Sequence, residues 1–211
     1  MCFSAEASIR SLLAGLTGSL LCISLGTTTD KIVGFFLGFV SLMQGIEYLL
    51  WTHQKCDNYN RFISVLGMVL NHLQPFILGL IVLLLNPKTA NYRKIVTLMV
   101  FYLIVFIPYS YQFLKMKGTM CTIKGVTSKN EHEHLIWKWN SMPYSQFCYT
   151  VFLFVMCAIF ILGTPNKSAG LRFAAVATIT YSTSLIFYPR EVAGALWCYY
   201  TAYIPFIYYL F

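Results

Sequence analysis

Long apolar stretches separated by short polar turns fill most of the chain. A helix that crosses a bilayer needs about 20 consecutive, mostly apolar residues. Stretches of this kind run from residues 7 to 28, 32 to 52, 62 to 86, 94 to 114, 146 to 163, 170 to 188 and 191 to 211. Unbroken runs such as Phe76 to Leu85 exclude a transmembrane barrel, whose strands alternate between apolar and polar residues. The pattern predicts an all-α membrane protein with seven transmembrane helices.

The composition agrees with a chain embedded in lipid over its whole length. Of its 211 residues, 58% are hydrophobic and 10% are charged, and the mean hydropathy is +0.65, whereas soluble domains carry about 25% charged residues. We expect one transmembrane domain over residues 1 to 211, with the lipid bilayer as its partner. The net charge of +8 is spread over the loops, so no nucleic-acid binding is predicted. A small solute or ion as ligand, and assembly into a homo-oligomer, remain open.

The order of the predicted helices suggests an internal duplication. Leu25-Gly26-Thr27 matches Leu162-Gly163-Thr164 at an offset of 137 residues. The proposed segments are a first repeat from 7 to 86, a linker helix from 94 to 114, a long loop from 115 to 145, and a second repeat from 146 to 211. This plan of three, one and three helices resembles the parallel repeats of SWEET and PQ-loop transporters, whose substrate site lies between the repeats. The Pro-Gln signature of those families is not present, because Gln74-Pro75 reverses it.

Glu47 is the most informative polar residue within a predicted helix, because a carboxylate is costly in hydrocarbon. Gln44, Glu47 and Trp51 are spaced to share one helix face. As a functional group, Glu47 would be a metal ligand, a proton carrier or a general base. The structural alternative is an ion pair with Arg190 or Arg61 that fixes the packing of helices.

Asn71 and His72 lie near the middle of the third predicted helix, close before Pro75. A proline inside a helix frees a backbone carbonyl and loosens the helix locally. His72 would then relay protons or bind substrate. Its structural alternative is a hydrogen bond to a neighbouring helix.

Several groups able to bind a metal or act as nucleophiles lie near the end of the bundle that carries the amino terminus. Removal of Met1 would expose the amine and thiol of Cys2, and Cys198 lies about two turns into the last helix. In the long loop, Glu131-His132-Glu133-His134 is either a ligand cluster or a solvated segment; if extended, its histidines share one side and its carboxylates the other. Cys56 and Cys121 would form a disulfide if this end is extracytoplasmic, and would stay reduced if it is cytoplasmic.

The opening Met1-Cys2-Phe3-Ser4-Ala5-Glu6-Ala7-Ser8 resembles that of an uncharacterised family of small polytopic membrane proteins, best represented in bacteria. The further segments that resemble the family's pattern are Gln44-Gly45-Ile46-Glu47 with Trp51, the segment around His134, Phe187-Tyr188-Pro189, and Trp197-Cys198. The basic turns of that family imply an extracytoplasmic amino terminus and a cytoplasmic carboxyl terminus here. Charge alone does not decide the orientation, because lysine and arginine occur at both ends of the predicted bundle. The resemblance implies no known activity.

Two functions from different classes follow, and the sequence does not decide whether the chain is an enzyme. A transporter or channel for a small solute or ion would line its path with Gln44, Glu47, His72 and Tyr188. A membrane-embedded enzyme or metal-binding protein would build its site at the amino-terminal face from Cys2, Glu47, His134 and Cys198. A thiol, a carboxylate and an imidazole suit zinc or copper, and they equally suit a thiol nucleophile with an acid–base pair. A receptor or a structural membrane component is the third interpretation.

Overall fold

The computed structural model describes residues 4 to 89, 91 to 116, 120 to 127 and 130 to 208. Its elements are α1 (Ala5–Leu25), α2 (Thr28–Thr52), α3 (Asn58–Leu85), α4 (Tyr92–Lys115), β1 (Ile123–Thr127), β2 (Asn130–Ile136), the 3₁₀-helix η1 (Lys138–Ser141), α5 (Ser145–Gly163), α6 (Lys167–Phe187), α7 (Arg190–Thr201) and α8 (Ile204–Tyr208). Within these residues, six helices, α1 to α6, are long and apolar enough to cross a membrane. The predicted all-α fold is therefore confirmed.

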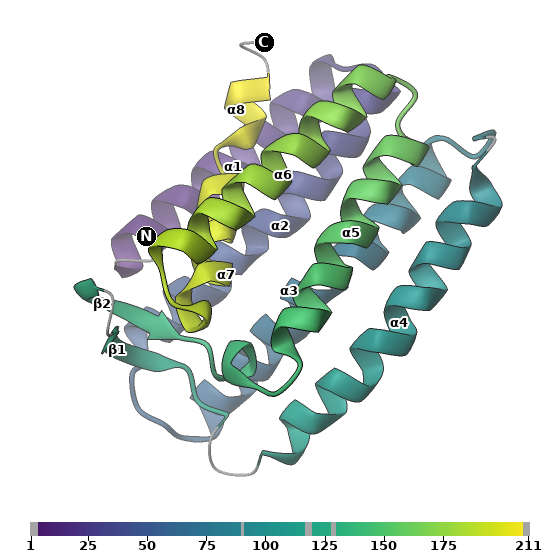
Figure 1. The fold of residues 1–211 in the computed structure, drawn as a ribbon. Coiled ribbons are helices and arrows are strands. Elements are labelled where there is room, and N and C mark those ends of the chain that lie inside the picture. The colour runs from purple at the N-terminus through teal and green to yellow at the C-terminus, as the bar shows by residue number, and fades with distance from the viewer. Residues whose placement is uncertain (1–3, 90, 117–119, 128–129, 209–211) are drawn as a thin grey trace.

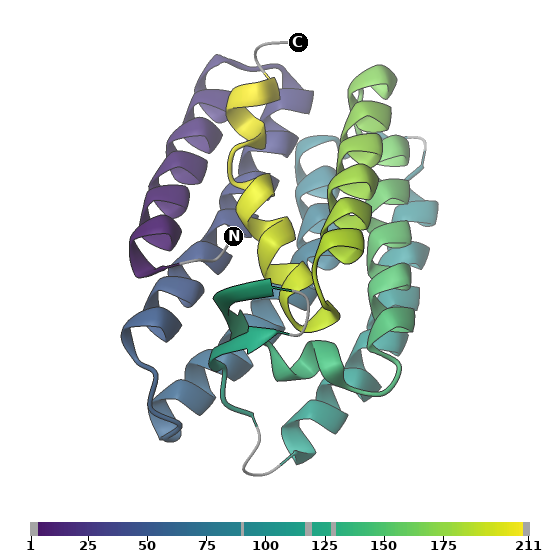
Figure 2. The same ribbon diagram turned by 60° about the vertical axis from the view of Figure 1, so that its left-hand side comes forward.

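The long helices run up and down between two ends of the bundle (Figure 1). We call the end that carries the start of α1, the α2–α3 turn and the two strands the hairpin end. The far end carries the α1–α2, α3–α4 and α5–α6 turns. Helices α7 and α8 follow one another along the bundle from the hairpin end to the far end (Figure 2). The start of the described chain thus lies near the hairpin end, and its last residues lie at the far end.

The last predicted span, 191 to 211, differs from the prediction of one continuous helix. Its first part, α7, has 12 residues and is only about 18 Å long, which is too short to cross a bilayer alone. The helix breaks after Thr201 because Pro205 has no N–H to donate to the carbonyl four residues earlier. A tighter turn, with Tyr203 N–H bonded to the Tyr200 carbonyl, leads into α8.

Small residues on α2 bring α1 very close. A Cβ added at Gly34 would lie 2.8 Å from the Ser19 carbonyl oxygen, and one added at Gly38 would lie 3.4 Å from the Ser19 side chain. Further along α2, the Ser41 side chain and the Ala202 carbonyl, just after α7, both lie close to Gly15 of α1. Ser41 and Ala202 are therefore at the same level of the bundle.

The long loop predicted from 115 to 145 contains an antiparallel hairpin of β1 and β2. Glu133 is exposed and forms an ion pair with Lys124, whereas His134 is fully buried, so these two neighbours lie on opposite sides of an extended strand as predicted. The side chains of Glu131 and His132 lie outside the described part. Trp137 and Trp139 follow the hairpin and are buried in the protein.

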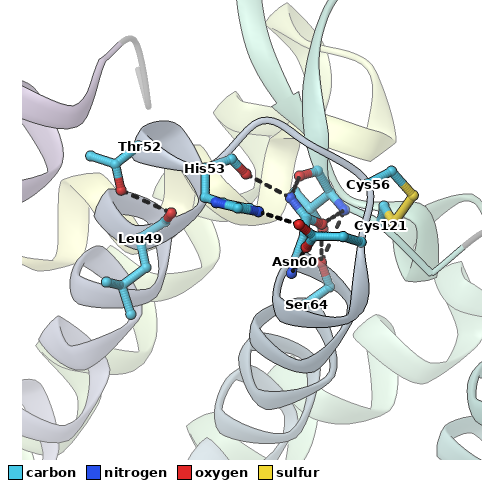
Figure 3. Close-up of polar contacts among 9 residues, drawn as sticks. Leu49, Thr52, His53, Cys56, Asn60, Ser64 and Cys121 are labelled. Carbon is cyan, nitrogen blue, oxygen red and sulfur yellow. Dashed lines mark hydrogen bonds and ion pairs between the residues drawn. A yellow bond between two sulfur atoms is a disulfide. The ribbon is translucent and has the colours of Figure 1, made fainter.

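A disulfide and a set of hydrogen bonds fasten this segment to the hairpin end (Figure 3). Cys56, in the α2–α3 turn, is bonded to Cys121, just before β1. Asn60 of α3 donates to the Thr122 carbonyl at 3.0 Å, and its side-chain oxygen accepts the Thr122 N–H at 3.0 Å. The Ser64 hydroxyl accepts from the same N–H at 2.9 Å. The disulfide and these hydrogen bonds thus hold the hairpin over one end of the bundle.

Candidate functional site

Helices α2, α3 and α7 bring several polar side chains together between the hairpin end and the middle of the bundle. Since Ser41 lies level with Ala202, Gln44 on α2 and Cys198 on α7 each lie about one turn nearer the hairpin end. Glu47 lies one turn further in the same direction. These three side chains are fully buried, so the protein interior here is polar although the surrounding helices are apolar.

Glu47, Cys198 and α3 meet in this region. Glu47 is close enough to Cys198 to act on the thiol electrostatically, and the Gln74 side chain lies near the same thiol without forming a hydrogen bond of normal geometry to it. The Cys198 thiol also points at the Asn71 side-chain oxygen, 3.7 Å away. The structure therefore brings together two of the four predicted ligands, Glu47 and Cys198, and adds two amides that the sequence analysis did not assign to the site.

The buried amides of this region are incompletely hydrogen bonded. Neither amide atom of Gln44 or Gln74 has a hydrogen-bond partner among the described residues, although both side chains are fully buried. Buried polar groups in native proteins are nearly always paired, and each exception needs an explanation. By contrast, Ser19 and Thr164, buried toward the far end, both donate to carbonyls of their own helices. The two incompletely bonded amides, Gln44 and Gln74, thus lie away from the far end.

A hydrogen-bonded network extends from this site toward α5. The Tyr149 hydroxyl accepts from the Asn71 amide at 2.9 Å and from the Trp139 indole at 3.3 Å. It donates to the Asn140 side-chain oxygen at 2.6 Å. Tyr149 therefore joins α3, the segment after the hairpin and α5, and it connects the Cys198 region with the surface helices.

His72 lies on another side of α3, among aromatic rings. Its ring is stacked on Phe106 at 5.4 Å and lies 5.1 and 5.0 Å from the rings of Tyr109 and Tyr149. The Tyr102 hydroxyl donates to the His72 carbonyl at 2.7 Å, and the Nε2 atom of His72 has no partner among the described residues. The structure thus places His72 between α3, α4 and α5 rather than beside Glu47.

The remaining predicted site residues lie above the bundle or outside the described chain. His134 of β2 packs edge-on against the ring of Tyr188, with centroids 5.7 Å apart, so the hairpin contacts the α6–α7 turn. Cys2 lies outside the described residues. In the part of the chain that is described, no three His, Cys, Asp or Glu side chains are grouped to hold one metal ion. The four-ligand zinc or copper site stays a prediction that depends on Cys2.

The sequence analysis missed Gln74, Tyr149 and Asn140 as parts of the polar interior. Gln74 was noted only for its order with Pro75, although an amide in a predicted span is itself a functional signal. Tyr149 and Asn140 carry no such signal, because tyrosine is common near membrane surfaces and Asn140 lies in a loop. Only the folded chain brings them together.

Comparison of the chain with protein-family models, with curated proteins and with solved structures finds no match. The resemblance to a family of small polytopic membrane proteins therefore stays a prediction, and the site is the basis for proposing a function.

Proposed function

We propose that the chain is an integral membrane protein with a buried binding site that opens toward the hairpin end only. We further propose that it acts there on a small hydrogen-bonding solute as a membrane-embedded enzyme or binding protein. Large apolar side chains on the outer surface support the membrane location: Leu20, Leu84, Ile104 and Ile186 are each at least 66% exposed. Water would make such a surface unfavourable, whereas lipid would not.

The single observation that carries the proposed site is the pair of buried, unpartnered amides, Gln44 and Gln74. Leaving a buried amide without partners costs about 1 to 3 kcal/mol, so two of them beside Glu47 are a substantial cost to folding. A polar ligand that bonds to both amides would remove this cost. Because amides both donate and accept, the ligand we infer carries hydrogen-bonding groups of both kinds.

An apolar layer beyond Gln74 supports a site open to one side rather than a path across the membrane. About 16 Å of α3 follows Gln74, and its buried residues Leu78 and Val82 face the interior. At this level Phe36 of α2 packs edge-on against Phe160 of α5, with centroids 5.2 Å apart. A polar solute would have to cross this packed layer to reach the far end.

The test is to purify the protein in mild detergent without chelator and analyse it by native mass spectrometry and elemental analysis. We expect a bound small molecule or ion in the parent protein that is lost in Gln44→Leu and Glu47→Gln. Glu133→Gln makes the same change of charge on the exposed hairpin and should retain it. A parent protein without any bound species, and without response to added solutes, would refute the proposed site. A near-stoichiometric metal would favour the zinc or copper form of the proposal.

Transport is the second candidate function, and interrupted helices favour it. Pro75 lies inside α3, and the break between α7 and α8 precedes Pro205. Transporters commonly build their substrate sites at such discontinuities. Flux of a solute into proteoliposomes that is lost in Glu47→Gln would make transport the leading function.

We also propose that the hairpin end is extracytoplasmic. The Cys56–Cys121 disulfide supports this orientation, because disulfides persist in oxidising compartments and are rare in the cytosol. The test is the reaction of intact cells with a membrane-impermeant reductant, followed by an alkylating mass tag. Both cysteines should become labelled without breaking the cells. Labelling only after cell lysis would reverse the orientation.

A further inference from the structure

We propose that a passage between α5, α6 and α7 admits a small anionic or zwitterionic solute to the buried site, with Tyr149 as its gate. This inference rests on the site proposed above and adds its route of access and the charge of its ligand. The inference rests on three neighbouring spaces in the protein, on Gly194 and on Arg190.

The outer part of the passage is an open groove at the start of α5. It has a volume of about 510 Å³, enough for a small organic solute, and extends from Ser141 through Phe147 to Arg190. A narrow pocket continues inward from it, since the two cavities share Ser145, Gln146 and Arg190. The narrow pocket has a volume of about 10 Å³, which is room for about one water molecule. The passage is thus wide outside and closed within.

The inner wall of the narrow pocket is formed by Asn140, Tyr149 and Gly194. The same three residues, together with Asn71 and Ala195, line a gap on the inner side that is too small to hold a water molecule. Because the Asn71 oxygen lies 3.7 Å from the Cys198 thiol, the hydrogen-bonded Tyr149–Asn140 pair lies between the narrow pocket and the site. Rotation of the Tyr149 side chain would join the narrow pocket to the inner gap.

Gly194 lies at the boundary between the narrow pocket and the inner gap, and its lack of a side chain leaves room for Tyr149 to move. A Cβ at this position would lie 3.2 Å from the Asn140 amide nitrogen and 3.4 Å from the Tyr149 hydroxyl. Any larger side chain would occupy the space into which the gate must move. A glycine within α7 destabilises the helix relative to alanine. The space that it leaves for the Tyr149 side chain gives this glycine a function.

Arg190 sets the charge of the ligand. Among the described residues it is the one charged side chain that lines both the groove and the narrow pocket, and it forms no ion pair with another described residue. The Glu191 carboxylate lies at the outer edge of the groove, where it accepts from the Ser141 hydroxyl at 3.3 Å. A guanidinium at the mouth attracts carboxylate or phosphate groups and repels cations. The donors further in, on Asn140 and Tyr149, are neutral. A solute fits this arrangement if it has an anionic group for Arg190 and a small polar remainder for Asn140 and Tyr149.

The experiment uses the Cys198 thiol as a reporter at the inner end. In a protein with Cys2, Cys22, Cys148 and Cys157 replaced by serine, Cys198 remains as the free thiol. Its rate of modification is measured with two methanethiosulfonate reagents of similar size, the anionic sulfonatoethyl form and the cationic trimethylammonium form. The anionic reagent should react faster, and Arg190→Gln should reduce this preference by roughly threefold or more at low salt.

Two further variants test the gate. Tyr149→Phe, which loses the bonds that hold the gate, should speed both reagents, and Gly194→Ala should slow both. Gly38→Ala is the matched control, because its Cβ would lie 3.4 Å from Ser19, away from the passage, and it should leave both rates unchanged. Unchanged rates in Gly194→Ala and Arg190→Gln, or no modification of Cys198 even in Tyr149→Phe, would overturn the passage.

The outcomes separate this inference from the proposed function. If ligand binding depends on Gln44 but the labelling rate of Cys198 is unchanged in Gly194→Ala and Arg190→Gln, the site is supported and the passage is refuted. If the labelling rate of Cys198 changes in Gly194→Ala and Arg190→Gln but the protein binds no ligand, the passage is supported and the proposed function is refuted.

Discussion

Removing the Tyr149 hydroxyl tests whether the polar interior is a connected structure. The Tyr149→Phe change leaves the ring in place and deletes one oxygen atom. That atom accepts from Asn71 and Trp139 and donates to Asn140. The variant therefore leaves three buried groups with one partner fewer and creates almost no cavity.

The expected loss follows from the three bonds. Side-chain hydrogen bonds between membrane helices contribute about 0.6 kcal/mol each on average, so three of them predict a loss of about 2 kcal/mol. Full desolvation penalties of about 1 to 3 kcal/mol per orphaned group would give more, but the buried groups can find partial substitutes. For a chain of this size a loss of about 2 kcal/mol lowers the melting temperature by roughly 4 to 8 °C.

The assay is thermal unfolding in a fixed detergent, with Tyr111→Phe as the matched control. Tyr111 is exposed on α4 and packs its ring on Lys115, a contact that phenylalanine keeps. We expect a change near zero in the control. Equal melting temperatures for the two variants would refute the idea that Tyr149 holds the interior network together.

Further predictions concern the hairpin end. The Cys56→Ser and Cys121→Ser variants should each lower the melting temperature and change mobility on non-reducing gels. The 65-residue separation sets an upper limit of about 4 kcal/mol, and membrane insertion of the helices between the two cysteines should reduce it. The Asn60 N–H, and then His53, lower the pKa of the Asp57 carboxyl below 3.8. Stabilisation by Asp57 should therefore be complete above about pH 4 and disappear as the pH falls through the folded value; a constant difference in melting temperature between the parent and Asp57→Ala down to the lowest pH would contradict this.

Much of the fold is predictable because the length of an apolar stretch and the residues that cap a helix are local properties of the sequence. The span predicted from 32 to 52 is α2, whose start is extended to Thr28 by a capping box between Thr27 and Asp30. The break at Pro205 and the hairpin within 115 to 145 were not predicted. The break has a local cause that the sequence analysis did not use, because Pro205 lacks an N–H. The hairpin depends on tertiary structure, because the disulfide to Cys56 fixes it. The proposed duplication stays a prediction, since its third helices differ in length.

The candidate site was predictable only in part. Glu47 and Cys198 were identified because ionisable and thiol groups in apolar spans are costly or reactive, and the structure brings them together. His72 has the same signal in the sequence but faces the aromatic rings of α4 and α5. Which side of α3 a residue faces depends on helix rotation, which sequence periodicity leaves loosely determined in a helix that is apolar all round.

The central claim is that the polar interior opens to the hairpin end and is closed toward the far end. The most direct measurement is labelling of single cysteines, Gln44→Cys or Val82→Cys, in sealed vesicles of known orientation with a small impermeant thiol reagent. The Cys56–Cys121 disulfide is kept, and the other cysteines are replaced by serine. We predict that Gln44→Cys is labelled only from the hairpin side and that Val82→Cys is labelled from neither side. Labelling of Val82→Cys from the far side, or of Gln44→Cys from both sides, would indicate a continuous path and contradict the one-sided site.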